Sequence, residues 1–211
     1  MSGMLVSALG ETMFMVLVST FFSALGGCTL AVPMILAGPA GLRPNAKLYA
    51  VLDISVNLLR SFPFMILMIA LIPFTRLVAG VAYGSTAAVV PLTIAAIPFT
   101  ARLVEGSLLE VDPGVVEAAR AFGASDARII FSVMFPEALP SVVLNIAVLA
   151  VTLLGYSAMA GAVGGGGLGA LAYNEGYIRF KADVMLGAVA VLIVIVQCIQ
   201  SGGNYLYGKL R

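Results

Sequence analysis

Apolar residues run along this chain in long blocks, and most charged residues stand between the blocks. Five segments are apolar and long enough to be helices that cross a lipid bilayer: residues 12–36, 54–77, 81–104, 138–160 and 184–207. Each is at least as long as the roughly 20 residues that the hydrocarbon core requires. Lipid offers no hydrogen bonds to the backbone, so spanning segments of this kind are helical. The pattern predicts an all-α membrane protein with five transmembrane helices, in one domain that covers residues 1–211.

The composition agrees with a lipid environment. Apolar residues make up 61% of the 211 positions and charged residues 10%, and the mean hydropathy is +1.10. A soluble domain carries about 25% charged residues. The net charge of +1 offers no basic footprint for nucleic acid. The chain has no histidine, which excludes Ser-His-Asp, Cys-His and histidine-ligated metal chemistry. We therefore expect no catalytic residue, no metal site and membrane lipid as the surroundings.

The N-terminus does not have the pattern of a signal peptide. Residues 1–12 contain no Lys or Arg, and the apolar run that follows Glu11 is long enough to span. Cys28 and Cys198 both fall inside apolar runs, so we interpret them as small hydrophobic side chains without a disulfide.

Lys and Arg residues near the ends of the spans predict the orientation, because cytoplasmic loops carry an excess of them. With the N-terminus outside, seven fall on the cytoplasmic side: Arg43, Lys47, Arg102, Arg120, Arg128, Lys209 and Arg211. Three fall outside: Arg76, Arg179 and Lys181. We therefore expect the N-terminus outside and the C-terminus in the cytoplasm.

The longest polar interruption, residues 110–136, has the signals of two short helices. Asp112 is placed as a helix cap, and Gly123 supplies a turn or a close approach. A second helix is expected from Ser125 to a stop before Pro136. Small side chains gather near the corner: Ala118, Ala119, Gly123 and Ala124. The segment faces the cytoplasm in the predicted topology, and its small residues would let the backbone of another protein approach.

Glu117-Ala118-Ala119, then Gly123, then Val133-Met134-Phe135-Pro136 resemble the EAA loop of the membrane subunits of ATP-binding-cassette importers. Val and Phe stand where that family usually has Ile and Leu before the Pro. The resemblance implies that a coupling helix docks into a separate ATP-binding subunit, with contacts from Glu117, Ala118, Ala119, Gly123 and Ala124. An ordinary amphipathic cytoplasmic hairpin is the alternative.

Three further runs, "NLLRSFPFMILMIALIPFTR", "VVPLTIAAIPFTARLVEGSLLEV" and "TLLGYSAMAGAVGGGGLG", resemble permeases of bacterial methionine importers. The resemblance implies a homodimer of five-helix subunits in the bacterial inner membrane, two ATP-binding subunits that hold ATP and Mg²⁺, and an extracytoplasmic methionine-binding protein. It implies import of methionine, including its D-isomer or close derivatives, by alternating access. Another small amino acid remains an alternative substrate.

Two glycine-rich segments have other candidate roles. Residues 203–209 match the glycine and lysine frame of a phosphate loop, but Leu210 replaces the Ser or Thr that binds Mg²⁺. ATP hydrolysis must therefore come from a partner chain. The structural interpretation of residues 161–169 is a flexible loop or a tight helix crossing. The functional interpretation is a surface that meets a binding protein or allows a constriction to open.

Candidate pathway residues lie on the second and fourth spans. Tyr156, Met159 and Val163 share one helical face, and two copies of Met159 in a symmetric dimer could close a pore; packing or lipid contact is the alternative. Arg60 follows Asp53 by seven residues on a polar helix face. Charges at membrane depth are costly unless they face protein or water, so this face either lines a path or lies in the wet interface.

A self-sufficient secondary transporter is the rival from another class. Such a protein would need an internal repeat and ionisable residues at the centre of the membrane. The chain has no convincing repeat, and Arg60 is the main intramembrane charge. No nucleophile with a matching base supports a membrane enzyme. The sequence therefore favours a permease that depends on a separate ATPase.

Overall fold

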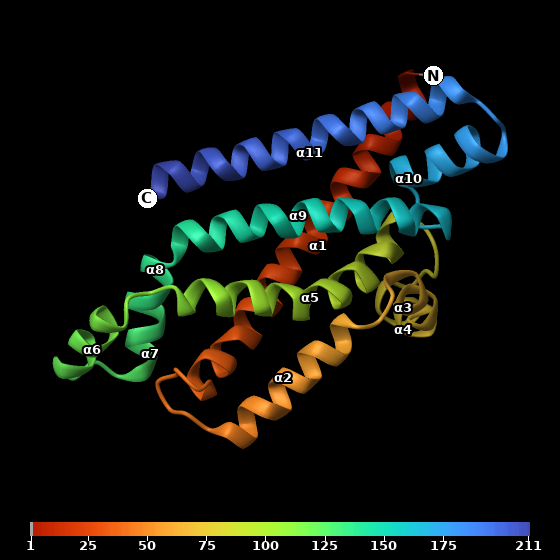
Figure 1. Cartoon of the computed structure of the whole chain (residues 1–211). Helices are drawn as coiled ribbons and strands as arrows, with labels where there is room; N and C mark the ends of the chain where they lie inside the picture. The colour runs from red at the N-terminus through yellow and green to blue at the C-terminus, as the bar shows by residue number, and fades with distance from the viewer. Residues whose placement is uncertain (1) are drawn as a thin grey trace.

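A computed structural model describes residues 2–211, and within them the chain is helical with no strand (Figure 1). The elements in chain order are α1 Ser2–Ala37, α2 Ala46–Arg60, α3 Phe64–Ala70, α4 Ile72–Ala79, α5 Ser85–Leu109, α6 Pro113–Ala121, α7 Asp126–Ile129, the π-helix η1 Ile130–Met134, α8 Phe135–Glu137, α9 Leu139–Ala162, α10 Gly167–Leu171, the π-helix η2 Ala172–Ile178 and α11 Ala182–Leu210. The predicted all-α class is confirmed.

Among the described residues, four helices are long and apolar enough to cross a membrane, namely α1, α5, α9 and α11. A fifth span exists only if α2 and α3 are counted together, and their axes differ by 94°. The expected span 54–77 is therefore not one helix. Pro63 is the cap residue directly before α3; it lacks a backbone N–H, and it disfavours helical geometry at Phe62. The chain turns at this point, then continues through α3 and α4.

α1 and α5 form the most extensive helix pair, and small residues bring them close together. A Cβ atom on Gly27 would lie 2.5 Å from the Cβ of Thr100. Ser19 Oγ donates to the Val89 carbonyl at 3.4 Å, and Ser23 Oγ donates to the Thr93 carbonyl at 3.2 Å. Small residues and serine hydroxyls of this kind hold membrane helices together, because apolar burial drives little association in lipid.

One hydrophobic core joins α1, α3, α5 and α9. Its buried members are Met15, Phe64, Met68, Ala88, Leu92, Ala96, Leu149, Leu153 and Ala160. α11 lies at the edge of this bundle, packed on α9 and η2, and only 11% of its apolar window is buried in the protomer (Figure 1). The wide exposed apolar surface fits a protein whose neighbours are lipid or other subunits.

The loops gather at two opposite ends of the bundle (Figure 1). The C-terminus, α6 to α8 and the α1–α2 connection lie at one end, and the N-terminus, α4, α10 and η2 lie at the other. The positions of α6 and the C-terminus at the same end match the predicted alternation of the spans. We call these the α6 end and the α10 end.

The glycine-rich segment 161–169 is a tight helix crossing. A Cβ atom on Gly161 would lie 2.2 Å from the Ala170 nitrogen, and one on Gly169 would lie 2.3 Å from the Ala158 carbonyl oxygen. α9 and α10 therefore touch backbone to backbone. Of the interpretations left open by the sequence, the structure supports close crossing over a flexible loop.

Two side chains of α1 cap the start of α10. The Gly167 N–H donates to Glu11 Oε2 at 2.7 Å, and the Leu168 N–H donates to Thr12 Oγ1 at 2.8 Å. The first N–H groups of a helix have no partner within the helix, so external acceptors satisfy them. This cap joins segments 156 positions apart and fixes the glycine crossing to α1.

Candidate functional site

The two short helices around a glycine corner are present as predicted. Asp112 Oδ1 accepts from the Gly114 N–H at 2.7 Å and caps α6. Gly123 has a φ of +79°, the left-handed conformation that glycine adopts at little cost. The N–H of Ala124 then bonds back to the Ala119 carbonyl at 3.1 Å. The corner is therefore a defined helix C-cap with a reversal of the chain.

The second helix departs from the prediction at its end. Ser125 caps α7, but the helical path continues through the π-helix η1 and through Pro136, which stands in the first turn of α8. The expected stop before Pro136 is therefore wrong. A proline in the first turn of a helix removes an N–H that has no intrahelical partner in any case, so the path continues with only a change of pitch.

A buried cluster joins this loop to the membrane helices. Ile129, Ile130 and Met134 are 0%, 2% and 6% exposed, and they pack with Ala31 and Ile35 of α1. Val104 and Leu108 of α5 belong to the same cluster. Apolar packing of this density resists relative movement. The loop and these parts of α1 and α5 are therefore packed together in one buried cluster.

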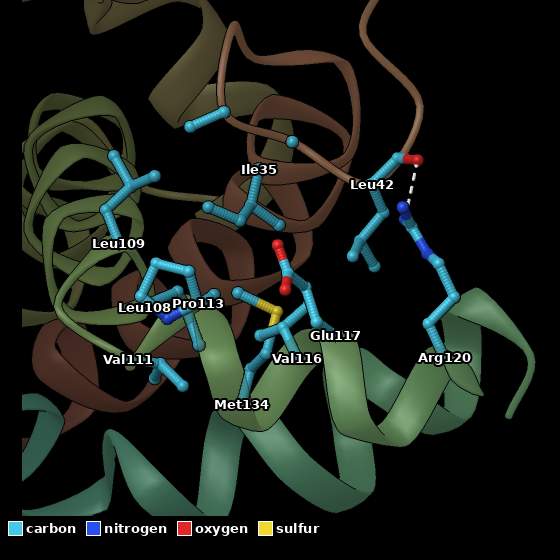
Figure 2. Close-up of a pocket in the computed structure, with 12 residues that line it drawn as sticks. Ile35, Leu42, Leu108, Leu109, Val111, Pro113, Val116, Glu117, Arg120 and Met134 are labelled. Atoms are coloured by element: carbon cyan, nitrogen blue, oxygen red, sulfur yellow. Dashed lines mark hydrogen bonds between the residues drawn. The ribbon is translucent and has the colours of Figure 1, made fainter. Parts of the chain in front are cut away.

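Polar contacts tie the loop to the α1–α2 connection. Arg120 Nη2 donates to the Leu42 carbonyl at 2.9 Å (Figure 2), and Arg43 forms an ion pair with Asp126. Beneath α6 lies a cavity of about 200 Å³ between the ends of α1 and α5. Figure 2 shows the Glu117 carboxylate directed toward this cavity rather than along the outer surface of α6.

The predicted coupling residues divide into two groups. Glu117, Ala118 and Gly123 are exposed, whereas Ala119 and Ala124 are half-buried against the cluster that anchors the loop. Phe122 was not among the predicted residues, and its side chain is 92% exposed at the corner. An aromatic residue directly before the motif glycine was the available signal. The exposed surface thus consists of α6 and the Phe122–Gly123 corner, which we call the coupling surface.

The candidate pathway residues are only partly brought together. Arg60 and Tyr156 line one cavity of about 200 Å³ at the bend between α2 and α3. Met159 is not part of this cavity and is 48% exposed on the protomer. Phe64 and Phe99 also line the cavity, and they could not be predicted because their proximity depends on tertiary packing.

The polar face of α2 is partly engaged by α5. Asp53 pairs with Arg102, and Arg102 Nη1 donates to Glu105 at 2.6 Å. Glu105 is 3% exposed, and Asn57 Nδ2 donates to Asp53 at 3.1 Å. Arg102 lies within α5 and joins it to α2, so it is not counted among the charges of the α6 end. Within residues 2–211, no group of three or more Cys, Asp and Glu side chains is arranged to hold a metal ion.

Comparisons with known proteins agree with this geometry. A protein of Vibrio cholerae named "Probable D-methionine transport system permease protein MetI" is 46% identical over 209 residues, which are 99% of this chain and 93% of that protein. The methionine import system permease protein MetP of Bacillus subtilis is 44% identical over 173 residues, 82% of this chain and 78% of that protein.

A solved structure shows the same fold. It is an inward-facing conformation of the MetNI methionine ABC transporter, and it matches with a TM-score of 0.97 and 43% identity over 100% of this chain and 98% of that chain. The family model described as "Binding-protein-dependent transport system inner membrane component" matches residues 30–203. The resemblance indicated by the sequence motifs is thus confirmed, and the chain belongs to the family of inner membrane components of binding-protein-dependent transport systems.

Proposed function

We propose that this chain is the permease subunit of an ATP-binding-cassette importer that moves methionine, including its D-isomer or close derivatives, into the cytoplasm. The coupling surface carries the proposal, since an exposed helix with a glycine corner is anchored to the spanning helices by a buried cluster. Its relatives over most of the chain are methionine permeases by name. The chain contributes a path and a mechanical link, and it performs no covalent chemistry.

The importer contains two copies of this chain, two ATP-binding subunits and an extracytoplasmic methionine-binding protein. ATP and Mg²⁺ are bound by the ATP-binding subunits. Two observations support the dimer: the exposed apolar faces of the protomer and the exposure of Met159 on α9. A two-fold axis beside α9 would bring the two copies of Met159 together.

The charges support an orientation with the α6 end in the cytoplasm. Six Lys and Arg residues belong to elements at the α6 end: Arg43, Lys47, Arg120, Arg128, Lys209 and Arg211. Three belong to the α10 end: Arg76, Arg179 and Lys181. The excess at the α6 end is the distribution expected of a cytoplasmic face. The N-terminus is then outside, and the coupling surface faces the ATP-binding subunits.

Transport proceeds by alternating access. When ATP closes the two partner subunits, each coupling surface moves with them. The Ile129–Met134 segment transmits that movement to α1 and α5 through the buried cluster, and the Arg120 and Arg43 contacts carry it to the α1–α2 connection. The spanning helices then open toward the binding protein. Discrete packing arrangements of this type support two-state switching.

The pathway lies beside α9, with Met159, Tyr156 and Arg60 as its proposed residues. Met159 is a flexible apolar side chain suited to filling a narrow point. Tyr156 stacks on Phe64 with ring centroids 4.6 Å apart, which fixes one wall. Arg60 is a cation where the surrounding wall is apolar, and such residues in a membrane protein face a path or a partner.

Substitution at Gly123 tests the coupling role. Valine at a φ of +79° is strained by about 1–2 kcal/mol, so Gly123→Val should distort the corner. If the full strain is lost from docking, the affinity for the ATP-binding subunit falls roughly five- to thirtyfold. Gly123→Asn should retain function, because Asn tolerates this conformation. Gly208→Val is the matched control, since no atom lies within 4 Å of its added Cβ and its φ is helical.

The measurement is co-purification of the ATP-binding subunit together with methionine uptake per ATP hydrolysed in proteoliposomes. Gly123→Val should reduce one or both while the permease still inserts and dimerises. If Gly123→Val assembles normally and couples uptake to ATP hydrolysis normally, the proposed docking role is wrong.

A further inference from the structure

The cavity at the α2–α3 bend lies between the two charged ends of the molecule. Ala95 and Phe99 of its wall stand near the middle of α5, which places the cavity well inside the span. Its volume of about 200 Å³ is below the roughly 300–1,000 Å³ of pockets for drug-sized ligands. The space therefore suits a ligand of about the size of an amino acid.

One charged side chain lines this cavity, that of Arg60, and it is exposed on the protomer. Its Cζ lies 5.8 Å from the centroid of the Phe99 ring, within cation–π range. Within residues 2–211, the ion pairs do not include Arg60. A guanidinium inside a membrane protein is costly without an anion or water, and the ring face satisfies none of its N–H donors. The N–H donors of Arg60 are therefore available to an anion.

The rest of the wall is largely aromatic. Phe62, Phe64, Phe99 and Tyr156 line the cavity together with aliphatic residues. Phe64 and Tyr156 stack with an interplanar angle of 3°, and Phe64 is 7% exposed, so this wall is held in place. Aromatic rings contact apolar chains well and make favourable contacts with thioether sulfur.

We propose that this cavity binds the amino-acid substrate during its passage, with the α-carboxylate on Arg60 and the apolar side chain against the aromatic wall. Arginine binds a carboxylate through two parallel N–H···O bonds, a geometry that lysine lacks. The inference rests on the proposed function and adds a recognition step inside the permease. Lipid phosphates lie at the bilayer surface, whereas the cavity lies within the span, so a small carboxylate is the anion that fits.

The test measures protection of a cavity position in the complete importer in proteoliposomes. Leu59 lines the cavity and is 44% exposed, so Leu59→Cys in a background without other cysteines offers a thiol to a small permeant maleimide. Methionine should slow this labelling about tenfold, and norleucine, which lacks sulfur, should slow it less. Methioninol, which lacks the carboxylate, should give no protection. Leu77→Cys, 82% exposed on α4, is the control whose labelling should not change.

The second part of the test replaces Arg60. In the Leu59→Cys protein, Arg60→Met should raise the methionine concentration needed for half-maximal protection roughly ten- to hundredfold, the loss of affinity expected for hydrogen bonds to a charged group. Arg60→Lys should retain part of the protection because it keeps the charge. Arg76→Met, which removes a cation from α4 outside the cavity, should have no effect.

The outcomes separate the two proposals. The carboxylate assignment is overturned if methionine and methioninol protect equally, or if protection is complete in Arg60→Met. The proposed function still stands in that case, provided that the parent complex takes up methionine when ATP is supplied. Absence of that uptake in the parent complex overturns the proposed function itself. If Arg60→Met does not assemble, the comparison of methionine with methioninol decides the question alone.

Discussion

The cap that joins α1 to α10 depends on the Thr12 hydroxyl, so we expect its removal to lower the stability of the protein. Thr12 is 1% exposed, and its hydroxyl oxygen accepts the N–H of Leu168, which is 0% exposed. Thr12→Val keeps the shape of the side chain and removes the acceptor. Water has little access to the site, so the Leu168 N–H would be left buried without a partner.

The magnitude follows from the cost of an unsatisfied buried donor, about 1–3 kcal/mol. For a chain of this length, 1 kcal/mol shifts the unfolding midpoint by about 2–4 °C, so a loss near 2 kcal/mol lowers it by about 4–8 °C. Thr29 on the same helix is a matched control, because it is exposed and its hydroxyl bonds only to the Leu25 carbonyl of its own helix at 2.8 Å. Thr29→Val should change the midpoint by about 1 °C or less.

The assay is thermal unfolding of the purified complex in detergent, followed by the loss of monodisperse protein. Glu11→Gln provides a graded comparison, since the amide oxygen still accepts the Gly167 N–H and should cost less than Thr12→Val. Equal midpoints for Thr12→Val and Thr29→Val would show that the cap contributes nothing beyond helix packing.

Three further predictions concern topology, the pathway and pH. In a background without other cysteines, Asp126→Cys should react with an impermeant thiol reagent only from the cytoplasmic side and Glu175→Cys only from outside; the reverse would overturn the proposed orientation. Met159→Ala should alter transport or cause a leak while assembly and ATP binding are kept, and normal transport would make Met159 a packing residue. The hydrogen bond from Lys181 and the charge of Arg179 lower the pKa of Glu175. The contribution of Glu175 to stability is therefore complete above the usual glutamate pKa of about 4.3, and it is lost as the pH falls through the lower pKa of the folded state. Glu175→Gln should abolish that part of the acid dependence. The measurement is the unfolding midpoint as a function of pH.

Features set by neighbouring residues could be predicted from the sequence. The cap at Asp112 and the corner at Gly123 follow from local rules for helix ends, and both are present. The spans follow from hydropathy, which measures how apolar a segment is. Hydropathy carries no direction, however, so the 94° turn after Arg60 was missed although Pro63 marked it.

Features that depend on tertiary contacts could not be predicted. Nothing near Glu11 in the sequence indicates a partner 156 positions away, and nothing near Arg60 identifies Phe99 as its neighbour. The sequence did identify Arg60 and Tyr156 separately, by charge and by helical face. Their common cavity depends on the bend between α2 and α3, which the sequence analysis did not contain.

We propose that this chain carries methionine only when a separate ATPase drives it through the coupling surface. The most direct measurement is uptake of labelled methionine by proteoliposomes that contain this chain, its ATP-binding subunit and its binding protein. Uptake should require ATP and all three components, and Gly123→Val should diminish it while Gly208→Val leaves it unchanged. Methionine uptake by the chain alone under an ion gradient, or no ATP-dependent uptake by the complete set, would show that the chain does not depend on the ATPase in this way.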